Sequence, residues 1–298
     1  MINITQDEYN KRIKNSIKSN ESYLFTNPKN KKEIIKINNI DIINLKYNEN
    51  KQYTIKLLVD NYEYLQELDR IIIPKEIVSI DLIPSGYTMK YLKKSRVLKD
   101  VLNDQEITID SKISYLKQIG EILRQLDSFR DKYPHLSNLY YNDIHEGNFL
   151  ITQKEKVYGI DFESCSILDN IPTISLYPML LDRILLGTSY KYPSNKYICE
   201  SSTNLIPNRN LDLYSYTMII LNFMYGVNYH KWTKTDLNIY LNYLDYHGAN
   251  KEFLYTISYL YDENKDNINP DYLLDYIKEM QPYCSKLSMD EHYKRLLR

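Results

Sequence analysis

The sequence predicts an α+β fold with a small antiparallel sheet in residues 1–92 and a mainly helical second part in residues 93–298. The first part holds short runs of apolar and β-branched residues that are bounded by turn residues, a pattern typical of strands. In the second part, apolar residues recur every three or four positions over long stretches, which is typical of amphipathic helices. Because 298 residues are enough for two hydrophobic cores, we expect one domain made of two lobes.

The first part predicts a β-hairpin, a helix and further strands, in that order. Residues 22–26 and 33–37 flank a turn signal at 27–30, which predicts the hairpin. Apolar residues at helical spacing predict a helix over 51–68. The remaining segments with strand character are 40–47, 77–82 and 86–92, the last two separated by Pro84-Ser85.

The second part predicts a series of helices. The segment 111–130 has an amphipathic pattern and a capping signal at Asp110-Ser111. The segment 212–226 is apolar nearly all round, so we expect it in the middle of a domain, with Gly226 at its C-terminal cap. Further helical patterns cover 174–186, 234–246, 251–261 and 270–280.

Composition and charge are those of a soluble intracellular protein. The formal net charge of -1 argues against a general nucleic-acid or membrane-surface role. Residues 1–20 are polar and show no signal peptide, and no apolar run approaches the ~20 residues of a membrane helix. Three widely separated cysteines indicate reduced thiols. Abundant Lys, Asn and Ile and 31 tyrosines indicate an AT-rich genome, so we expect the cytoplasm of a low-GC bacterium or of its phage-infected cell.

Three polar residues in apolar surroundings form the most informative motif. Asp143 precedes Asn148 by five residues, and Asp161 follows Asn148 by thirteen. Short strands or tight loops can direct all three side chains into one cleft. Such a set suits ATP-dependent phosphoryl transfer, in which one carboxylate orients the acceptor hydroxyl while an amide oxygen and a second carboxylate bind Mg²⁺. The alternative is an Asx-turn with two surface carboxylates, which the two spacings and the apolar context disfavour.

The motif resembles the catalytic core of the protein-kinase-like superfamily, in which a catalytic Asp, a metal-binding Asn and the Asp of D-F-G recur. The resemblance implies that Asp143 is the catalytic base, that Asn148 and Asp161 bind Mg²⁺, and that ATP is the phosphate donor. The form D-x-H-x-G-N followed by I-D-F-E, with His145 and Glu163, is closer to aminoglycoside and choline kinases than to typical Ser/Thr kinases.

The helix predicted at 212–226 is similar to the central helix of protein kinases. In that family an Asp at the start of this helix braces the catalytic loop, and Asp212 occupies the matching position at the expected N-cap. An ordinary helix cap remains the alternative for Asp212.

The resemblance also implies a nucleotide-binding strand and hinge. The segment 86–92 is similar to the last strand of the kinase small lobe, with Met89 at the gatekeeper position and the backbone of Lys90 to Leu92 at the adenine edge. No glycine precedes Gly86, so the glycine-rich phosphate cover is absent, and we expect the turn containing Pro28 to replace it.

The sequence leaves alternatives for the phosphate-binding lysine and for the acidic residue that pairs with it. Lys36 resembles the lysine that contacts the α- and β-phosphates, while Lys46 is the competing candidate and a solvated strand lysine a further alternative. Its partner on the helix is either Glu63 or Glu49.

The function implied is ATP-dependent transfer of a phosphate to a hydroxyl, in the manner of a Ser/Thr protein kinase. The alternatives are a small-molecule kinase of the aminoglycoside or choline type and a pseudokinase that serves as a nucleotide-binding or interaction module. We expect ATP and a protein or small-molecule hydroxyl as partners, and neither nucleic acid nor a membrane.

Overall fold

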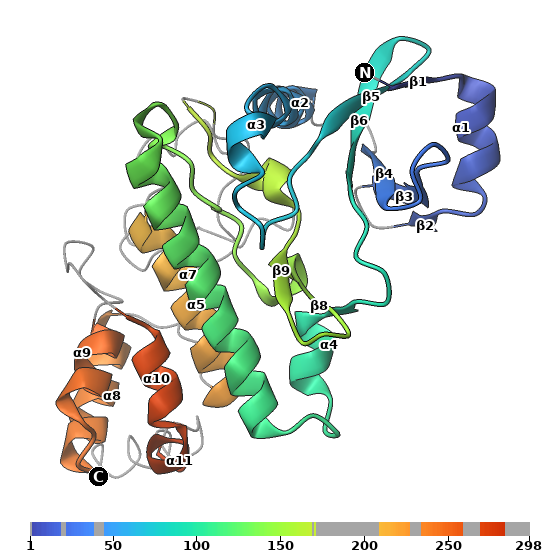
Figure 1. The fold of residues 1–298 in the computed structure, drawn as a ribbon. Helices are drawn as coiled ribbons and strands as arrows, with labels where there is room; N and C mark the ends of the chain where they lie inside the picture. Colours follow the sequence, from blue (N-terminus) through green and yellow to red (C-terminus); the bar gives the residue numbers. More distant parts are fainter. Residues whose placement is uncertain are drawn as a thin grey trace.

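The computed structural model has an α+β architecture, as the sequence predicts, with helices of very different lengths (Figure 1). The predicted antiparallel sheet is wrong in one respect: the six-stranded sheet is mixed, because β1 (Ile2–Ile4) pairs with β5 (Glu76–Ile80) in parallel. The sheet and the last helices of the chain lie at opposite ends of the molecule. The structure describes residues 2–18, 22–38, 45–168, 170, 209–226, 234–258 and 269–283.

The large sheet has the strand order β1-β5-β6-β4-β3-β2, in which β1 and β5 are parallel and all other neighbours antiparallel. Its strands are β1 (Ile2–Ile4), β2 (Ile17–Lys18), β3 (Ser22–Thr26), β4 (Glu33–Asn38), β5 (Glu76–Ile80) and β6 (Ile83–Lys90). A second sheet, in the order β7-β8-β9, consists of β7 (Arg96–Val97), β8 (Phe149–Ile151) and β9 (Val157–Gly159).

The predicted hairpin is confirmed as β3 and β4. Its turn is closed by the Asn27 N–H, which donates to the Glu33 carbonyl at 3.0 Å. The boundary predicted at Pro84-Ser85 is wrong, since both residues lie inside β6. The chain turns instead at Asp81 and Leu82, which have φ values of 46° and 72°. Asp adopts this left-handed region more readily than most residues, but Leu rarely does, so residue type alone did not reveal the turn.

The third strand predicted at 40–47 is wrong where the structure describes it, because Leu45 already begins helix α2 (Leu45–Asp60). The predicted helix 51–68 is therefore longer at its start, and α3 (Tyr62–Leu65) continues it. α2 packs against β5, β6 and the short helix η4 (Phe162–Ser164). Helix α1 (Gln6–Ile13), which the sequence did not predict, is closed by a capping box between Thr5 and Glu8.

The helical part is built around the long helix α5 (Ile109–Lys132) and the central helix α7 (Arg209–Met224), which pack against each other (Figure 1). Burial on nearly every side confirms the central position predicted for α7. The cap of α5 differs from the prediction: the hydroxyl of Thr108 accepts from the Ser111 N–H. The other helices are α4 (Leu98–Asn103), α8 (Lys234–Tyr246), α9 (Lys251–Ser258), α10 (Asp271–Asp275), α11 (Ile277–Met280), η2 (Pro134–Leu136) and η3 (Glu146–Asn148).

These helices confirm the predictions at 234–246, 251–261 and 270–280 in position, although the last one divides into α10 and α11. The predicted helix 174–186 lies outside the described residues. Within the described ranges, no helix is both long enough and apolar enough to cross a membrane. Of the cysteines, the described Cys165 is buried with a free thiol.

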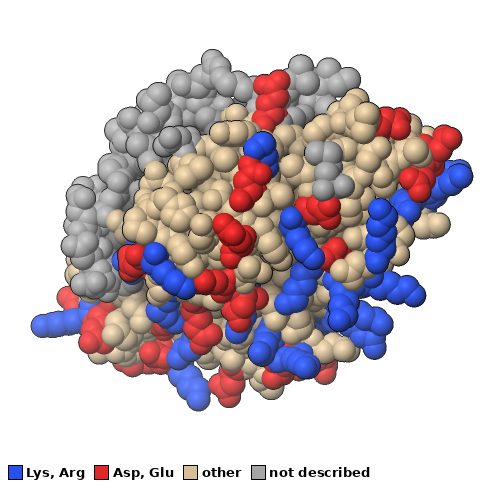
Figure 2. All heavy atoms as spheres, turned by 45° about the horizontal axis from the view of Figure 1, so that its top comes forward, with Lys and Arg blue, Asp and Glu red and all other residues tan. Residues whose placement is uncertain are grey.

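Charged side chains of both signs are distributed over the surface, where acidic and basic residues lie close together over much of the face in Figure 2. A small set of charged residues is buried instead, and burying a charge is costly unless it is paired. In the described part of the chain these residues are Glu33, Lys36, Lys51, Asp143, Glu163 and Asp212. All except Glu33 belong to the site described next.

Candidate functional site

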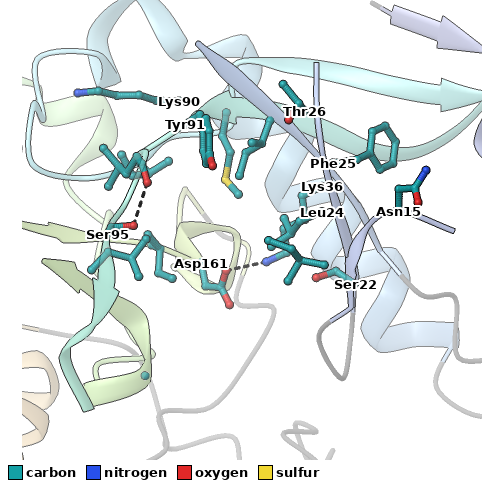
Figure 3. A pocket seen from close by; sticks show the side chains of 18 residues that line it. Asn15, Ser22, Leu24, Phe25, Thr26, Lys36, Lys90, Tyr91, Ser95 and Asp161 are labelled. Carbon is teal, nitrogen blue, oxygen red and sulfur yellow. Dashed lines mark hydrogen bonds and ion pairs between the residues drawn. The ribbon is translucent and has the colours of Figure 1, made fainter. Parts of the chain in front are cut away.

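A pocket of about 440 Å³ opens between the large sheet and the second sheet (Figure 3). Strands β2, β3, β4 and β6 line one side, and the loops at the start of β8 and after β9 line the other. Most of the pocket wall is apolar, and its charged lining residues are Lys36, Lys90 and Asp161. The apolar lining residues include Leu24, Ile34, Ile72, Met89, Leu150 and Ile160.

The predicted hinge residues Met89, Lys90 and Leu92 all line this pocket. Met89 is buried at the end of β6, and the chain then leaves the sheet toward β7. The Tyr91 N–H donates to the Lys32 carbonyl at 2.9 Å, and the Leu92 carbonyl accepts from the Ser95 hydroxyl at 2.9 Å. The connecting segment is therefore held in a fixed position along the edge of the pocket.

Lys36 is a buried lysine of the large sheet, on strand β4. Its Nζ donates to Asp161 Oδ1 at 2.6 Å and to Glu163 Oε1 at 2.5 Å. Burial disfavours the ammonium, but the carboxylates of Asp161 and Glu163 outweigh it, so the pKa of Lys36 lies well above its usual value. Lys36 is therefore a permanent cation in the wall of the pocket.

Glu163 is the buried partner of this lysine. Besides Lys36, its carboxylate accepts from the Tyr87 hydroxyl at 2.6 Å and lies 3.6 Å from Lys51 Nζ. Burial opposes its ionisation, but Lys36 and then Lys51 reverse the effect, so the pKa of Glu163 lies below its usual value. The same burial, together with the charge of Glu163, raises the pKa of Tyr87. Glu163 is thus an anion that never meets solvent.

Asp161 and Asn148 are brought together by the pairing of β8 with β9. The Ile160 N–H donates to the Asn148 carbonyl at 2.9 Å, so the two residues lie at adjacent ends of the paired strands. Asp161 has a φ of 58°, a left-handed conformation that Asp adopts more readily than most residues. Its side chain is 39% exposed and faces the pocket, whereas Asn148 is buried and lies outside the pocket lining.

Tyr141 fixes the backbone beneath these residues. Its hydroxyl donates to the Ile160 carbonyl at 2.6 Å and lies 3.2 Å from the Asn148 carbonyl. The ring stacks on Phe149, and a Cβ added at Gly159 would approach this ring to 2.8 Å. A glycine is therefore required at position 159 for the tyrosine to reach the strand ends.

Asp143 lies beside Asn148 and not in the wall of the pocket. The Asn148 side-chain amide donates to the Asp143 carbonyl at 2.8 Å and to Asp143 Oδ2 at 3.1 Å. His145 Nε2 is 3.8 Å from the same carboxylate oxygen, and His145 Nδ1 accepts from the Gly147 N–H at 3.0 Å. The carboxylate of Asp143 is thus oriented by its neighbours and shielded from solvent.

Asp212 braces the loop that carries Asp143. Its two carboxylate oxygens accept from the N–H groups of Tyr141 at 2.9 Å and of Asn142 at 2.8 Å. Asn142 has a φ of 68°, a left-handed conformation that few residues besides Gly, Asn and Asp adopt readily, and the brace fixes it. The expected contact is confirmed, but Asp212 lies in the first turn of α7 and not at its N-cap.

Asp212 also makes a pH-dependent contribution to stability. Burial raises the pKa of Asp212 to about 6, although the N–H groups of Asn142 and Tyr141 act in the opposite direction. Because an unfolded Asp has a pKa of about 3.9, the folded protein binds the extra proton between these values. The contribution to the free energy of unfolding is roughly 2–3 kcal/mol. It is fully present below about pH 4 and is lost as the pH rises through 6.

Asp212→Asn removes this titration, so the free energy of unfolding of the wild type relative to the variant should fall by that amount between pH 4 and pH 7. Urea unfolding of both proteins at several pH values measures the difference, in which the other titrating groups cancel. A difference that does not change with pH would mean that Asp212 stays ionised throughout.

The donor set at Asp161 and Asn148 fits Mg²⁺ only as an incomplete site. Within the part of the chain that the structure describes, no three His, Cys, Asp or Glu side chains are grouped as metal ligands. Mg²⁺ in nucleotide enzymes is held by one or two protein ligands, and water and phosphate oxygens complete its shell. Asn148 uses its Nδ2 as a donor to Asp143, which leaves its Oδ1 as the oxygen for a cation.

The structure bears on several alternatives for Lys36. It joins Lys36 to Asp161, whereas the side chain of Lys46, on α2, lies outside the described residues, so the choice between the two lysines stays a prediction. Glu49 and Glu63 are exposed, so neither proposed helix partner is correct, and Glu163 takes that place. Pro28 is not among the residues that line the pocket, whereas Ile17, Ser22 and other residues of β2 and β3 are.

The residues that sequence reasoning missed are Glu163 as a lysine partner, Tyr87 and Lys51. The one available signal was Glu163 itself, a charged residue directly after the apolar Phe162 in a buried segment. Neither the known protein-family models nor the curated proteins match this chain.

Proposed function

We propose that the protein is an ATP-dependent phosphotransferase with a two-lobed, protein-kinase-like fold, which transfers the γ-phosphate of ATP to a hydroxyl. The observation that carries the proposal is the 2.6 Å contact between Lys36 and Asp161 in the wall of a 440 Å³ pocket. An apolar pocket with one fixed cation and one accessible carboxylate suits a purine followed by a metal-bound triphosphate.

The arrangement of elements supports the same fold. In this proposal residues 1–92 form the small lobe, with α2 packed against β5 and β6, and residues 93–298 form the large lobe around α5 and α7. The segment after Met89 connects the two and presents its backbone to the purine edge. Asp212 adds support, because its bonds to the Tyr141 and Asn142 N–H groups hold the loop of Asp143.

Each residue then has a defined role in the transfer. Lys36 would donate to the α- and β-phosphates, and Asn148 and Asp161 would hold Mg²⁺, which when bound neutralises the phosphate charge. The acceptor oxygen attacks the γ-phosphorus, the bond to the β–γ bridging oxygen breaks, and Asp143 receives the acceptor's proton. Asn148 orients the Asp143 carboxylate through its 3.1 Å hydrogen bond.

The acceptor of first choice is a Ser or Thr hydroxyl of a protein, because the Asp212 brace matches that of protein kinases. A small-molecule hydroxyl is the second candidate, favoured by His145 beside Asp143 and by Glu163 after Asp161. Incubation with radiolabelled ATP, with and without lysate of the host, separates these candidates. Label on protein bands supports the first, label on a small metabolite supports the second, and no label on either supports a pseudokinase.

Nucleotide binding itself is expected to require Mg²⁺ and Asp161. Asp161→Asn removes the carboxylate but keeps a residue that tolerates the φ of 58°. The variant should lose the Mg²⁺-dependent part of the Tm increase that ATP produces, since the triphosphate charge is then poorly neutralised. Thermal unfolding with ATP in Mg²⁺ and in EDTA measures this part.

Asp100→Asn is the matched control, because Asp100 is exposed on α4 and lies outside the pocket lining. It should retain the full Mg²⁺·ATP shift. An equal shift in Asp161→Asn and the wild type would assign Asp161 a structural role and remove the metal site from the proposal.

A further inference from the structure

Two carboxylates share Lys36, and they differ in their access to solvent. Asp161 is 39% exposed and lines the pocket, whereas Glu163 is fully buried behind it. Asp161 is therefore the carboxylate that can turn to a metal ion, while Glu163 can only stay with Lys36. When Asp161 changes partner, Glu163 is the anion that keeps the ammonium of Lys36 in place.

Helix α2 contributes a cation to this cluster where an acidic partner was expected. Lys51 is buried on the face of α2 that packs against η4, and its Nζ lies 3.6 Å from Glu163 Oε1. The acidic residues Glu49 and Glu63 point to solvent. The buried carboxylate that pairs with Lys36 is thus Glu163 in η4, which follows β9. Helix α2 places a second lysine, Lys51, beside the same carboxylate.

Glu163 is the fully buried carboxylate that Lys36 contacts, and it also lies 3.6 Å from Lys51 Nζ. Without the charge of Glu163, the buried ammonium of Lys36 would keep the half-exposed Asp161 as its carboxylate partner, and Lys51 would lose its contact with Glu163. An unpaired buried charge destabilises a fold strongly, more than the intact pair stabilises it.

We propose that Glu163 is the positioning residue for Lys36 and that Lys51 couples helix α2 to the pocket through Glu163. The phosphate side of this inference rests on the proposed function. With Glu163 present, Lys36 keeps a partner while Asp161 binds Mg²⁺. With glutamine in place of Glu163, Asp161 is the remaining carboxylate of Lys36, so the ion pair and Mg²⁺ compete for it.

The coupling is tested without nucleotide by thermal unfolding of Glu163→Gln, Lys51→Met and the double variant. Glu163→Gln should lower Tm by on the order of 10 °C, because it removes the buried carboxylate that pairs with the Lys36 ammonium. The change in Tm that Lys51→Met produces should differ between the wild type and the Glu163→Gln background. Only the wild type has the 3.6 Å contact between Lys51 Nζ and Glu163 Oε1 for this substitution to remove.

Lys56→Met is the matched control on the same helix, where Lys56 is exposed and pairs with Asp60. It should shift Tm by a similar small amount in both backgrounds. If Lys51→Met also behaves alike in both backgrounds, the proposed coupling through Glu163 is wrong.

The positioning role is tested by calorimetric binding of adenosine and of Mg²⁺·ATP to the wild type and to Glu163→Gln. Adenosine affinity should stay the same, since adenosine has no phosphates for Lys36. Mg²⁺·ATP affinity should fall roughly 10- to 100-fold, the loss expected for a hydrogen bond to a charged group, and more Mg²⁺ should be needed for binding. If Glu163→Gln alone does not fold, the double variant with Lys51→Met carries this measurement.

Equal losses for adenosine and ATP, or no loss for either, would overturn the positioning role. A wild-type protein that binds no nucleotide would overturn the proposed function, while the Tm comparison would still decide whether Lys51 is coupled to Glu163.

Discussion

Asp143→Asn is expected to lower the rate of phosphate transfer by roughly 10²–10⁴-fold, the usual loss for a general base. The substitution keeps the size of the side chain and an oxygen that can accept from Asn148 Nδ2, as Asp143 Oδ2 does at 3.1 Å. It removes the charge that attracts the proton of the acceptor hydroxyl. Since Asp143 lies outside the pocket lining, nucleotide affinity should change little.

Single-turnover transfer with labelled ATP and calorimetric ATP binding, measured on the same preparation, separate the two effects. Asp131→Asn is a suitable control, because Asp131 is an exposed aspartate near the end of α5. A strong loss of ATP affinity with transfer intact would place the phosphates near Asp143. That result would exchange the roles of Asp143 and Asp161.

The close approach of Asn148 and Asp161 could be predicted from sequence because it depends on local pairing. Two short apolar segments, β8 and β9, are separated by only a few residues, so they form a hairpin whose ends carry the polar side chains. The hairpin of β3 and β4 was predictable for the same reason. In each case the two strands and the turn between them lie within one short stretch of the sequence.

The partner of Lys36 could not be predicted in this way. Lys36 and Glu163 are 127 positions apart, and their contact depends on how α2 and the turn after β9 pack against the sheet. The periodicity of α2 defines a buried face but does not say which charged residue at its edge turns inward. Only the packed structure distinguishes the buried Lys51 from the exposed Glu49.

The turn at Asp81-Leu82 and the start of α2 were missed for a different reason. Pro84 is a common turn residue, yet here it lies in β6 beside a register shift at Val78 and Ser79 that accommodates it. Likewise, the β-branched residues before α2 have strand propensity, yet the helix already begins at Leu45. Local propensity alone was a weak guide at both places.

Lys36→Met should reduce both stability and nucleotide binding, whereas Lys46→Met should do neither. The loss of Lys36 leaves the buried Glu163 with Tyr87 and the more distant Lys51 as its partners. Removing one member of a buried ion pair costs about 3–5 kcal/mol, so the free energy of unfolding should fall by a similar amount. The triphosphate also loses its fixed cation, so Mg²⁺·ATP affinity should fall at least as far as in Glu163→Gln.

Urea unfolding of the two lysine variants measures the first effect, and titration with Mg²⁺·ATP and with adenosine measures the second. Adenosine should bind folded Lys36→Met as it binds the wild type, because the apolar lining of Met89, Ile34 and Leu150 is unchanged. Both variants remove one lysine charge, so a general effect of net charge would appear in both. A larger loss of ATP affinity in Lys46→Met would transfer the phosphate contact to α2 and leave Lys36 as a structural cation that neutralises Asp161 and Glu163.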